Sequence, residues 1–460
     1  MRLVSPHRML KILRLKLRLS PTQLIVIAFA AIMLTGGFAL SLPISSRSGQ
    51  WTSFIDALFT AVSATCVTGL VVVDTYQYWS GFGQAVILTL IQIGGLGLMT
   101  FSTLASFLLR RSISLKERMA QVQSLNMQDI QGIIRLTRNI LIGTFSAEAT
   151  GALILSFRLL PDFGFPGALF RGVFHSVSAF CNAGFDIMGE KSQFTSLTGY
   201  VSDPTVNLVV MGLVVAGGLG FLVWEEIYQK RSFRRLTVYS KMVIVITGIL
   251  ILFGAAFIFA LEYGNPETLG RLGFKGKVLA AFFQSVTART AGFNTVDMSS
   301  LRDSSKAIMT FLMYIGGSSG STAGGIKTVT FGILAVMLWH SLKGHGDVVV
   351  GRRRISEANV YRAWGIVGIS LAIVLGGSMF ISIVNHVDIT SALFEMTSAF
   401  GTVGLTLGIT TSLVPASKIL VMLTMFFGRV GIFTIAYAIA VKSGSHRPDF
   451  RYPECKVLIG

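Results

Sequence analysis

The sequence predicts an all-α integral membrane fold, in which four tandem span–pore helix–span repeats surround one pore with pseudo-four-fold symmetry. Three observations support this prediction. The 460 residues are 52% hydrophobic and only 13% charged, whereas about a quarter of the residues in a soluble domain are charged. Eight stretches are apolar enough to cross a bilayer. A short segment that ends in glycine recurs four times between them, so we expect eight transmembrane helices and four re-entrant pore helices.

The eight expected transmembrane helices are apolar runs near the ~20 residues that a bilayer requires. In chain order they cover residues 24–43, 82–109, 140–160, 206–223, 242–261, 308–338, 364–384 and 418–441. The third and the sixth are interrupted by a charge or by small polar residues. The first follows a basic start and also fits a signal peptide, but it is longer than the apolar core of such a peptide, so we interpret it as a span.

The net charge of +18 comes from basic residues that gather on one side of an eight-span topology. Five clusters lie within residues 2–18, 110–118, 230–241, 343–354 and 442–456. The positive-inside rule therefore places both termini and three connecting loops in the cytoplasm of a multi-pass inner-membrane protein. Because the charge is dispersed over loops, it favours contact with anionic membrane lipids and argues against nucleic acid as a partner.

Residue types that carry catalysis or hold metals are scattered along the sequence. Cys66, Cys181 and Cys455 have neither metal-ligand nor disulfide spacing, and the six histidines include no His-Glu-x-x-His arrangement. We therefore expect no enzyme and no covalently bound cofactor. A polytopic membrane enzyme stays as the weaker alternative of a different class.

The recurring segment occupies residues 59–70, 174–185, 283–293 and 394–405. Each copy has Phe, then Val or Thr three residues later, then Ser or Thr followed by Ala, and a late Gly before Leu or Phe. The Phe-to-Gly separation is 10, 10, 9 and 10, so the third copy is one residue shorter. Each copy starts as an apolar helix too short to cross a bilayer. Non-helical backbone at membrane depth is tolerated where it lines a cavity, so four copies predict a central pore.

The glycines of the four copies suit a cation site made of backbone carbonyls. Such a site needs several oxygen dipoles that point at one axis and replace the hydration shell of the ion. Glycine adopts positive φ at little steric cost, so one glycine per repeat is what a ring of four carbonyls requires. The alternative is that each glycine only makes a tight turn between a helix and a span.

Four motifs carry a resemblance to a known family: Val67 to Leu70, Asn182 to Phe185, Arg289 to Phe293 and Gly401 to Leu405. They resemble the repeats of the Ktr/Trk/HKT superfamily of K⁺ and Na⁺ transporters, most closely the Ktr-type pore-forming membrane subunit, over essentially the whole chain. The resemblance implies a K⁺ selectivity filter with K⁺ at its carbonyls, made of Cys66, Val67, Thr68, Gly69, Cys181, Asn182, Ala183, Gly184, Arg289, Thr290, Ala291, Gly292, Gly401, Thr402, Val403 and Gly404.

The same resemblance implies K⁺ uptake across the cytoplasmic membrane. All four filter glycines are present, which in the family goes with K⁺ preference, whereas Na⁺-favouring relatives have Ser in the first repeat. A Na⁺ or mixed monovalent cation transporter, and Na⁺-dependent K⁺ uptake, stay open. The family also implies a homodimer and a cytoplasmic RCK-type nucleotide-binding regulatory subunit. Since this chain has no dinucleotide fingerprint, the nucleotide would bind only to that partner.

Small residues recur in the second span of each repeat. Residues 94–97 and 217–220 both read Gly-Gly-Leu-Gly, which favours close helix packing. The third repeat has a longer run that cannot be a stable helix, here called the Gly-Ser loop (residues 316–325). The resemblance implies that this loop gates the pore, with a plain kink as the alternative. The implied gate residues are Gly316, Gly317, Ser318, Ser319, Gly320, Ser321, Thr322, Ala323, Gly324, Gly325 and Lys327.

Three charged residues are expected at membrane depth. Arg429 lies in the middle of the last span and resembles the pore-facing arginine of the family, which acts with the loop as an electrostatic barrier; the alternative is a structural pair with a carboxylate. For Arg289 we favour a structural role, with Glu395 or Asp56 as its partner. For Glu148 we favour a buried anchor over a ligand for a coupling ion.

The repeats predict the boundaries of the chain. We expect a basic cytoplasmic N-terminus at 1–20 and a cytoplasmic tail at 443–460. The four repeats are expected at 21–110, 111–231, 232–343 and 344–442, and the second span of the third repeat is broken by the Gly-Ser loop.

Overall fold

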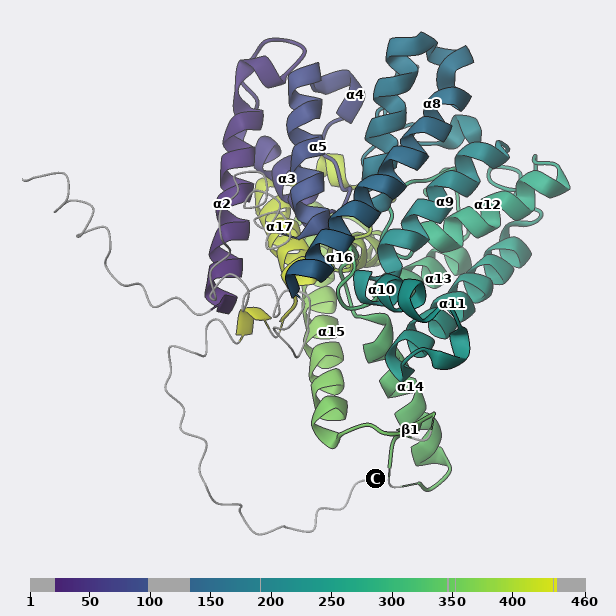
Figure 1. The fold of residues 1–460 in the computed structure, drawn as a ribbon. Coiled ribbons are helices and arrows are strands. Elements are labelled where there is room, and N and C mark those ends of the chain that lie inside the picture. The colour runs from purple at the N-terminus through teal and green to yellow at the C-terminus, as the bar shows by residue number, and fades with distance from the viewer. Residues whose placement is uncertain are drawn as a thin grey trace, which may run out of the picture.

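A computed structural model describes residues 21–97, 133–190, 192–345, 347–351, 353–432 and 434–436. The predicted N-terminal segment, the basic cluster at 110–118 and the C-terminal tail lie outside these residues. The described chain is mostly helical (Figure 1). Its helices of ten or more residues are α2 (Pro21–Ser41), α3 (Phe54–Cys66), α5 (Gly81–Leu96), α8 (Ile133–Phe180), α9 (Pro204–Leu219), α10 (Phe221–Lys230), α11 (Val238–Glu262), α12 (Phe274–Thr287), α13 (Asp303–Tyr314), α14 (Thr328–Leu342), α15 (Glu357–Asn385), α16 (Ile389–Gly401) and α17 (Pro415–Val430).

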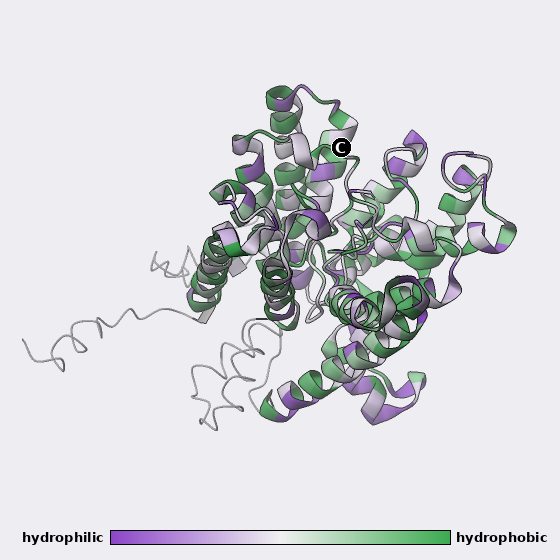
Figure 2. Cartoon of the chain, turned by 90° about the horizontal axis from the view of Figure 1, so that it is seen from above, coloured by the Kyte–Doolittle hydropathy of each residue, from purple (hydrophilic) through white to green (hydrophobic). Residues whose placement is uncertain are grey.

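Four described helices, α2, α8, α11 and α15, are long and apolar enough to cross a bilayer. The bent pair α9 and α10, which turns by 94°, would make a fifth span. Viewed from above, hydrophobic residues cover much of the helical part of the molecule (Figure 2). Hydropathy predicted eight spans, of which only the third and the sixth were expected to be interrupted, so this arrangement differs from the prediction.

The difference arises because the predicted second spans are interrupted. Glycines with positive φ end α5, α9 and α17, with φ of 78° at Gly97, 91° at Gly220 and 90° at Gly431. A residue with positive φ cannot continue a right-handed helix, and glycine adopts positive φ at little steric cost. Each of these helices therefore ends at its glycine. Between α13 and α14 the Gly-Ser loop makes the interruption.

Four short apolar helices lead into the glycine-containing segments. They are α3, the C-terminal part of α8, α12 and α16. α8 runs for 48 residues because it includes a kink at Gly164, where φ is 65°, between Pro161 and Pro166. Proline removes a helical hydrogen bond and glycine accepts the kinked backbone. The chain thus turns from a long apolar helix into the short helix within one element.

Four hydrophobic clusters join the predicted quarters of the chain in cyclic order. One contains both Trp79 and Phe174, the next contains Val214 and Phe293, and the third contains Met313 and Phe394. The fourth contains both Phe59 and Val421, and thereby joins the last quarter to the first. Figure 1 shows this closure, since α17 lies beside α3. The quarters therefore surround a common centre.

A small antiparallel hairpin, β1 (Val349–Val350) and β2 (Arg353–Arg354), joins α14 to α15. These two helices extend below the rest of the molecule in Figure 1.

Candidate functional site

The four glycine segments (residues 66–69, 181–184, 289–292 and 401–404) share one backbone conformation. The second residue of each is left-handed, with φ of 59° at Val67, 60° at Asn182, 69° at Thr290 and 50° at Thr402. The fourth residue is glycine with φ of 93°, 68°, 84° and 90° in chain order. A left-handed β-branched residue such as Val67 is unusual and strained. Its recurrence at one position in four separate segments indicates a shared structural requirement.

In three of the four segments the left-handed residue ends a short helix in a Schellman arrangement. In the first segment Val67 N donates to Ala64 O at 3.1 Å and Thr68 N donates to Ser63 O at 2.8 Å. Asn182 and Ala183, and Thr402 and Val403, repeat this pair of bonds. Because the amides are bonded back to the helix, the carbonyl oxygens of the segment are free to point elsewhere.

The serine or threonine of the recurring Ser/Thr-Ala pair braces each segment, a role that sequence reasoning did not assign. Ser63 Oγ accepts from Gly69 N at 3.1 Å, and Ser398 Oγ accepts from Gly404 N at the same distance. In the other two repeats the hydroxyl donates to the carbonyl after the glycine, Ser178 to Phe185 at 2.7 Å and Thr287 to Phe293 at 2.5 Å. The recurrence of these residues in the sequence was the signal.

The missing residue of the third copy is absorbed at the end of α12. Ala291 N donates to Thr287 O, four residues earlier, at 3.0 Å. The equivalent bond in the other three segments spans five residues, as between Thr68 and Ser63. The third segment therefore keeps the same conformation with a shorter helix end.

The four glycines meet in one ring, each beside the next segment in chain order. A Cβ on Gly69 would lie 2.5 Å from Ala183 O and 3.2 Å from Gly184 Cα. A Cβ on Gly184 would lie 2.6 Å from Ala291 O, and one on Gly292 would lie 2.5 Å from Val403 O. A Cβ on Gly404 would collide with Thr68 O, which closes the ring. Any side chain at these positions would displace a carbonyl oxygen of its neighbour.

The polar atoms nearest this ring belong to the backbone. Within the described ranges, no group of three or more His, Cys, Asp or Glu side chains is placed to hold a metal ion. Four short helices direct their C-terminal, partially negative ends at the ring, which favours a cation there. The start of α16 is fixed by Asp388, whose pKa is held below its usual value because its carboxylate accepts from the Ser391 backbone N–H.

The Gly-Ser loop is hydrogen-bonded to several other parts of the chain. At the α9–α10 bend, Ser318 N donates to Gly218 O and Phe221 N donates to Gly320 O, both at 3.0 Å. Gly324 N donates to Thr402 Oγ1, in the fourth glycine segment, at 3.1 Å. Tyr239 donates its hydroxyl to Ser319 O at 2.9 Å. The loop therefore lies directly beside the glycine ring and is held there.

Arg429, near the end of α17, connects this loop to the first quarter of the chain. Its guanidinium donates to Thr322 O of the loop and to Gly94 O, with a longer bond of 3.4 Å to Gly95 O. Gly94 and Gly95 lie in the last turn of α5, where carbonyls lack helical partners. Among the described residues no carboxylate forms an ion pair with Arg429.

The predicted carboxylate partners of Arg289 are wrong. Arg289 Nη2 donates to Gly316 O at 3.3 Å and to Thr328 Oγ1 at 3.2 Å. Glu395, in α16, instead accepts from two threonines in the loop that follows this helix. Asp56 forms an ion pair with Lys418. The carboxylates were already satisfied by nearer donors, which the sequence order does not show.

Glu148 joins two neighbouring quarters of the chain. Its carboxylate accepts from Gln92 Nε2 at 3.1 and 3.2 Å, and Cys181 Sγ lies 3.7 Å from its Oε1. These contacts link α8 to α5 and to the second glycine segment. The Glu148 carboxylate therefore fixes these three segments to one another.

The close packing predicted for the Gly-Gly-Leu-Gly motifs is confirmed. A Cβ on Gly94 would collide with Thr65 O, and one on Gly217 would collide with Phe180 O. The motifs also end their helices at Gly97 and Gly220, which the packing interpretation did not include.

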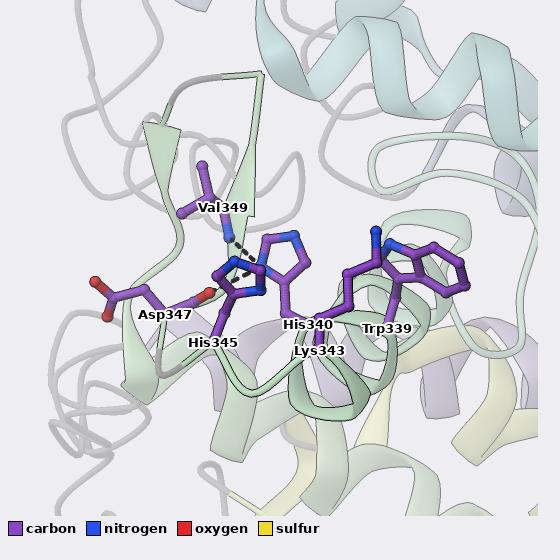
Figure 3. A pocket seen from close by; sticks show the side chains of 6 residues that line it. All are labelled: Trp339, His340, Lys343, His345, Asp347 and Val349. Atoms are coloured by element: carbon purple, nitrogen blue, oxygen red, sulfur yellow. Dashed lines mark hydrogen bonds between the residues drawn. The ribbon is translucent and has the colours of Figure 1, made fainter.

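A separate pocket lies at the opposite end of α14 from the Gly-Ser loop (Figure 3). Its walls are Trp339, His340, Lys343, His345, Asp347 and Val349. His340 Nδ1 lies 2.8 Å from Asp347 O and holds the start of the hairpin. The pocket shares no residue with the glycine segments or the Gly-Ser loop.

Comparison with known proteins gives a consistent result. The TrkH family model, described as a cation transport protein, matches residues 11–447. The chain is 42% identical to the Ktr system potassium uptake protein B of Bacillus subtilis, over 96% of this chain and 97% of that protein. It is 39% identical to the potassium/sodium uptake protein NtpJ of Enterococcus hirae, over 97% and 99%. The crystal structure of the potassium transporter TrkH from Vibrio parahaemolyticus shares the fold, with a TM-score of 0.72, 19% identity, and coverage of 92% of this chain and 85% of that one.

Proposed function

This chain belongs to the TrkH family of cation transport proteins, and on that premise we propose that it takes up K⁺ through the ring of four glycine segments. The ring is the observation that carries the proposal. Thr68 O, Ala183 O, Ala291 O and Val403 O lie against the glycines of the neighbouring segments. Carbonyls arranged in this way replace the hydration shell of K⁺.

The segments supply the selectivity of the site. Their amides are bonded back to the short helices and to Ser63 or Ser398, so the carbonyls keep their orientation when no ion is present. The ion therefore enters a site that needs little rearrangement. The membrane potential, worth about 2.3 kcal/mol per elementary charge per 100 mV, drives the uptake.

The Gly-Ser loop and Arg429 form the gate in this proposal. The loop is bonded to the α9–α10 bend and to Thr402, and Arg429 crosses from the loop to α5. A guanidinium beside a narrow pathway repels a cation, and these bonds hold the loop in the path. Opening requires that both the bonds and the arginine move.

The wider assembly follows the family in this proposal. Each quarter is a span–pore helix–span repeat, and the basic loops and both termini face the cytoplasm of the inner membrane. Two copies form a homodimer, and a cytoplasmic nucleotide-binding subunit of RCK type regulates the gate. The nucleotide binds to that subunit alone.

A Na⁺ or mixed-cation transporter is the second candidate. The observation that favours it is the E. hirae relative, which is named as a potassium/sodium uptake protein. The transported ion is decided by the same experiment.

The experiment measures ⁸⁶Rb⁺ and ²²Na⁺ uptake into proteoliposomes that contain the intact chain, Gly69→Ser or Gly49→Ser. Gly49 also has positive φ, 67°, but a Cβ there would meet nothing within 4 Å, so it is the matched control. We expect the intact chain and Gly49→Ser to prefer Rb⁺, and Gly69→Ser to lose that preference. Equal uptake of both ions by the intact chain would contradict K⁺ selectivity, and equal behaviour of the two variants would contradict the ring.

A further inference from the structure

Arg289 occupies an unusual position as the first residue of the third glycine segment. It lies two residues after Thr287, the last residue of α12, and only 8% of the residue is exposed. A buried guanidinium is costly unless acceptors surround it. In the described part of the chain none of its partners is a carboxylate, so its role rests on the two neutral acceptors that it does bind.

Both acceptors lie at the neck of the Gly-Ser loop, which we define as residues 316–317 and 326–328, where the chain enters and leaves the loop. Gly316 is the first residue of the loop, and Thr328 is the first residue of α14. The two ends are also bonded to each other, since Gly316 N donates to Ile326 O at 2.8 Å and Thr328 N donates to Gly317 O at 3.0 Å. Arg289 Nη2 thus reaches both sides of the neck, at 3.3 Å and 3.2 Å.

The charge of Arg289 is stabilised by helix ends. The residue follows the C-terminus of α12, and Gly316 lies two residues after the last residue of α13, Tyr314. Carbonyls at helix C-termini carry partial negative charge and lack helical partners, so they accept well from a guanidinium. The same chemistry holds Arg429 on the last turn of α5.

We propose that Arg289 is a positioning residue that ties the third glycine segment to the neck of the Gly-Ser loop. The inference rests on the proposed function, since it assigns this residue to the coupling of the selectivity site with the gate. A shift of the third segment moves the guanidinium, which then breaks or forms its two hydrogen bonds to the neck. The loop is then held closed by an element of the filter itself.

A small cavity of about 10 Å³ lies beside Arg289, with space for about one water molecule. Its walls include Val214, Thr247, Ile251, Val286 and Gly317. Arg289 Nε has no hydrogen-bond partner among the described residues, so the guanidinium is bonded on the neck side only.

The test follows the loop by chemistry that needs no transport. Ser319→Cys, in the loop, is labelled with a membrane-impermeant maleimide from the side where α14 ends, in the parent and in Arg289→Gln, Arg289→Lys and Thr328→Val. Thr247→Val is the matched control, because Thr247 borders the same cavity but does not touch the neck. Basal ⁸⁶Rb⁺ uptake and the Rb⁺/Na⁺ ratio are measured on the same preparations.

We expect Arg289→Gln and Thr328→Val to speed labelling and raise basal uptake about tenfold, as loss of a hydrogen bond to a charged group allows. Arg289→Lys should lie between, and Thr247→Val should match the parent. Unchanged labelling in both Arg289→Gln and Thr328→Val would overturn the proposal, as would a changed Rb⁺/Na⁺ ratio with unchanged labelling. If Arg289→Gln does not fold, Thr328→Val decides. Faster labelling in a chain that takes up no Rb⁺ supports the hydrogen-bonded link between Arg289 and the neck and contradicts the transport function.

Discussion

Lys418, in the last quarter of the chain, forms an ion pair with Asp56, in the first quarter, with Nζ 2.6 Å from Oδ1. Lys418 lies in α17 and Asp56 in the first turn of α3. The pair is partly buried, with 14% of the lysine and 28% of the aspartate side chain exposed. It joins the last quarter of the chain to the first, beside the hydrophobic cluster that closes the ring.

Breaking this pair should loosen the ring closure. Asp56→Asn and Lys418→Gln should each lower the thermal unfolding temperature, and the double variant should lose less than the sum. Because the pair is partly buried, we expect a coupling of about 1 kcal/mol, above the usual value for exposed pairs. The matched control is Arg354 with Glu357, which is largely exposed, with 56% and 74% of the side chains accessible. Equal coupling in the two cycles would show that the closure does not depend on the pair.

Removing the hydroxyl that braces a glycine segment should weaken selectivity. Ser63→Ala and Ser398→Ala each leave a buried glycine amide without its acceptor, at a cost of about 1–3 kcal/mol. We expect a lower Rb⁺/Na⁺ uptake ratio in both alanine variants. Ser63→Thr and Ser398→Thr, which keep the hydroxyl, should keep the parental ratio. Ser378→Ala is the control, because Ser378 is also buried but donates within α15, to Val374 O at 2.6 Å. A ratio that stays at the parental value in both test variants would rule out a bracing role.

Releasing the Gly-Ser loop should raise basal flux. Arg429→Gln removes the bridge from Thr322 to Gly94, and a deletion within residues 318–324 shortens the loop. Each change should raise basal ⁸⁶Rb⁺ uptake about tenfold, and the combination should add little, because both act on one gate. Arg271→Gln, at an exposed arginine, is the control. Unchanged or lower flux in the loop deletion would mean that the loop does not close the path.

Two glycines of α9 should respond differently to alanine. A Cβ on Gly217 would collide with Phe180 O, whereas one on Gly212 would meet nothing within 4 Å. Gly217→Ala should lower the yield of folded protein and its unfolding temperature, because backbone must shift. Gly212→Ala should be neutral or stabilise the helix by up to about 1 kcal/mol. Similar behaviour of the two variants would argue against the close approach.

The sequence by itself determined the four glycine segments and the membrane character of the chain. Both are local properties: a glycine can take positive φ whatever surrounds it, and a run of apolar residues is apolar in any fold. The recurrence of Gly69, Gly184, Gly292 and Gly404 after matching residues was therefore readable, as was the unusual depth of Arg429. The shorter third copy was also visible, although its accommodation at Thr287 was not.

Only the tertiary structure decided the partners of the buried charges and the breaks in the second spans. Asp56 binds Lys418, and Arg289 binds the neck of the loop, because these contacts depend on which segments the fold brings within about 3 Å. Gly97 and Gly220 end their helices, whereas Gly94 and Gly217 pack closely against neighbouring backbone. Sequence shows that a glycine permits both outcomes, and the surrounding backbone selects between them.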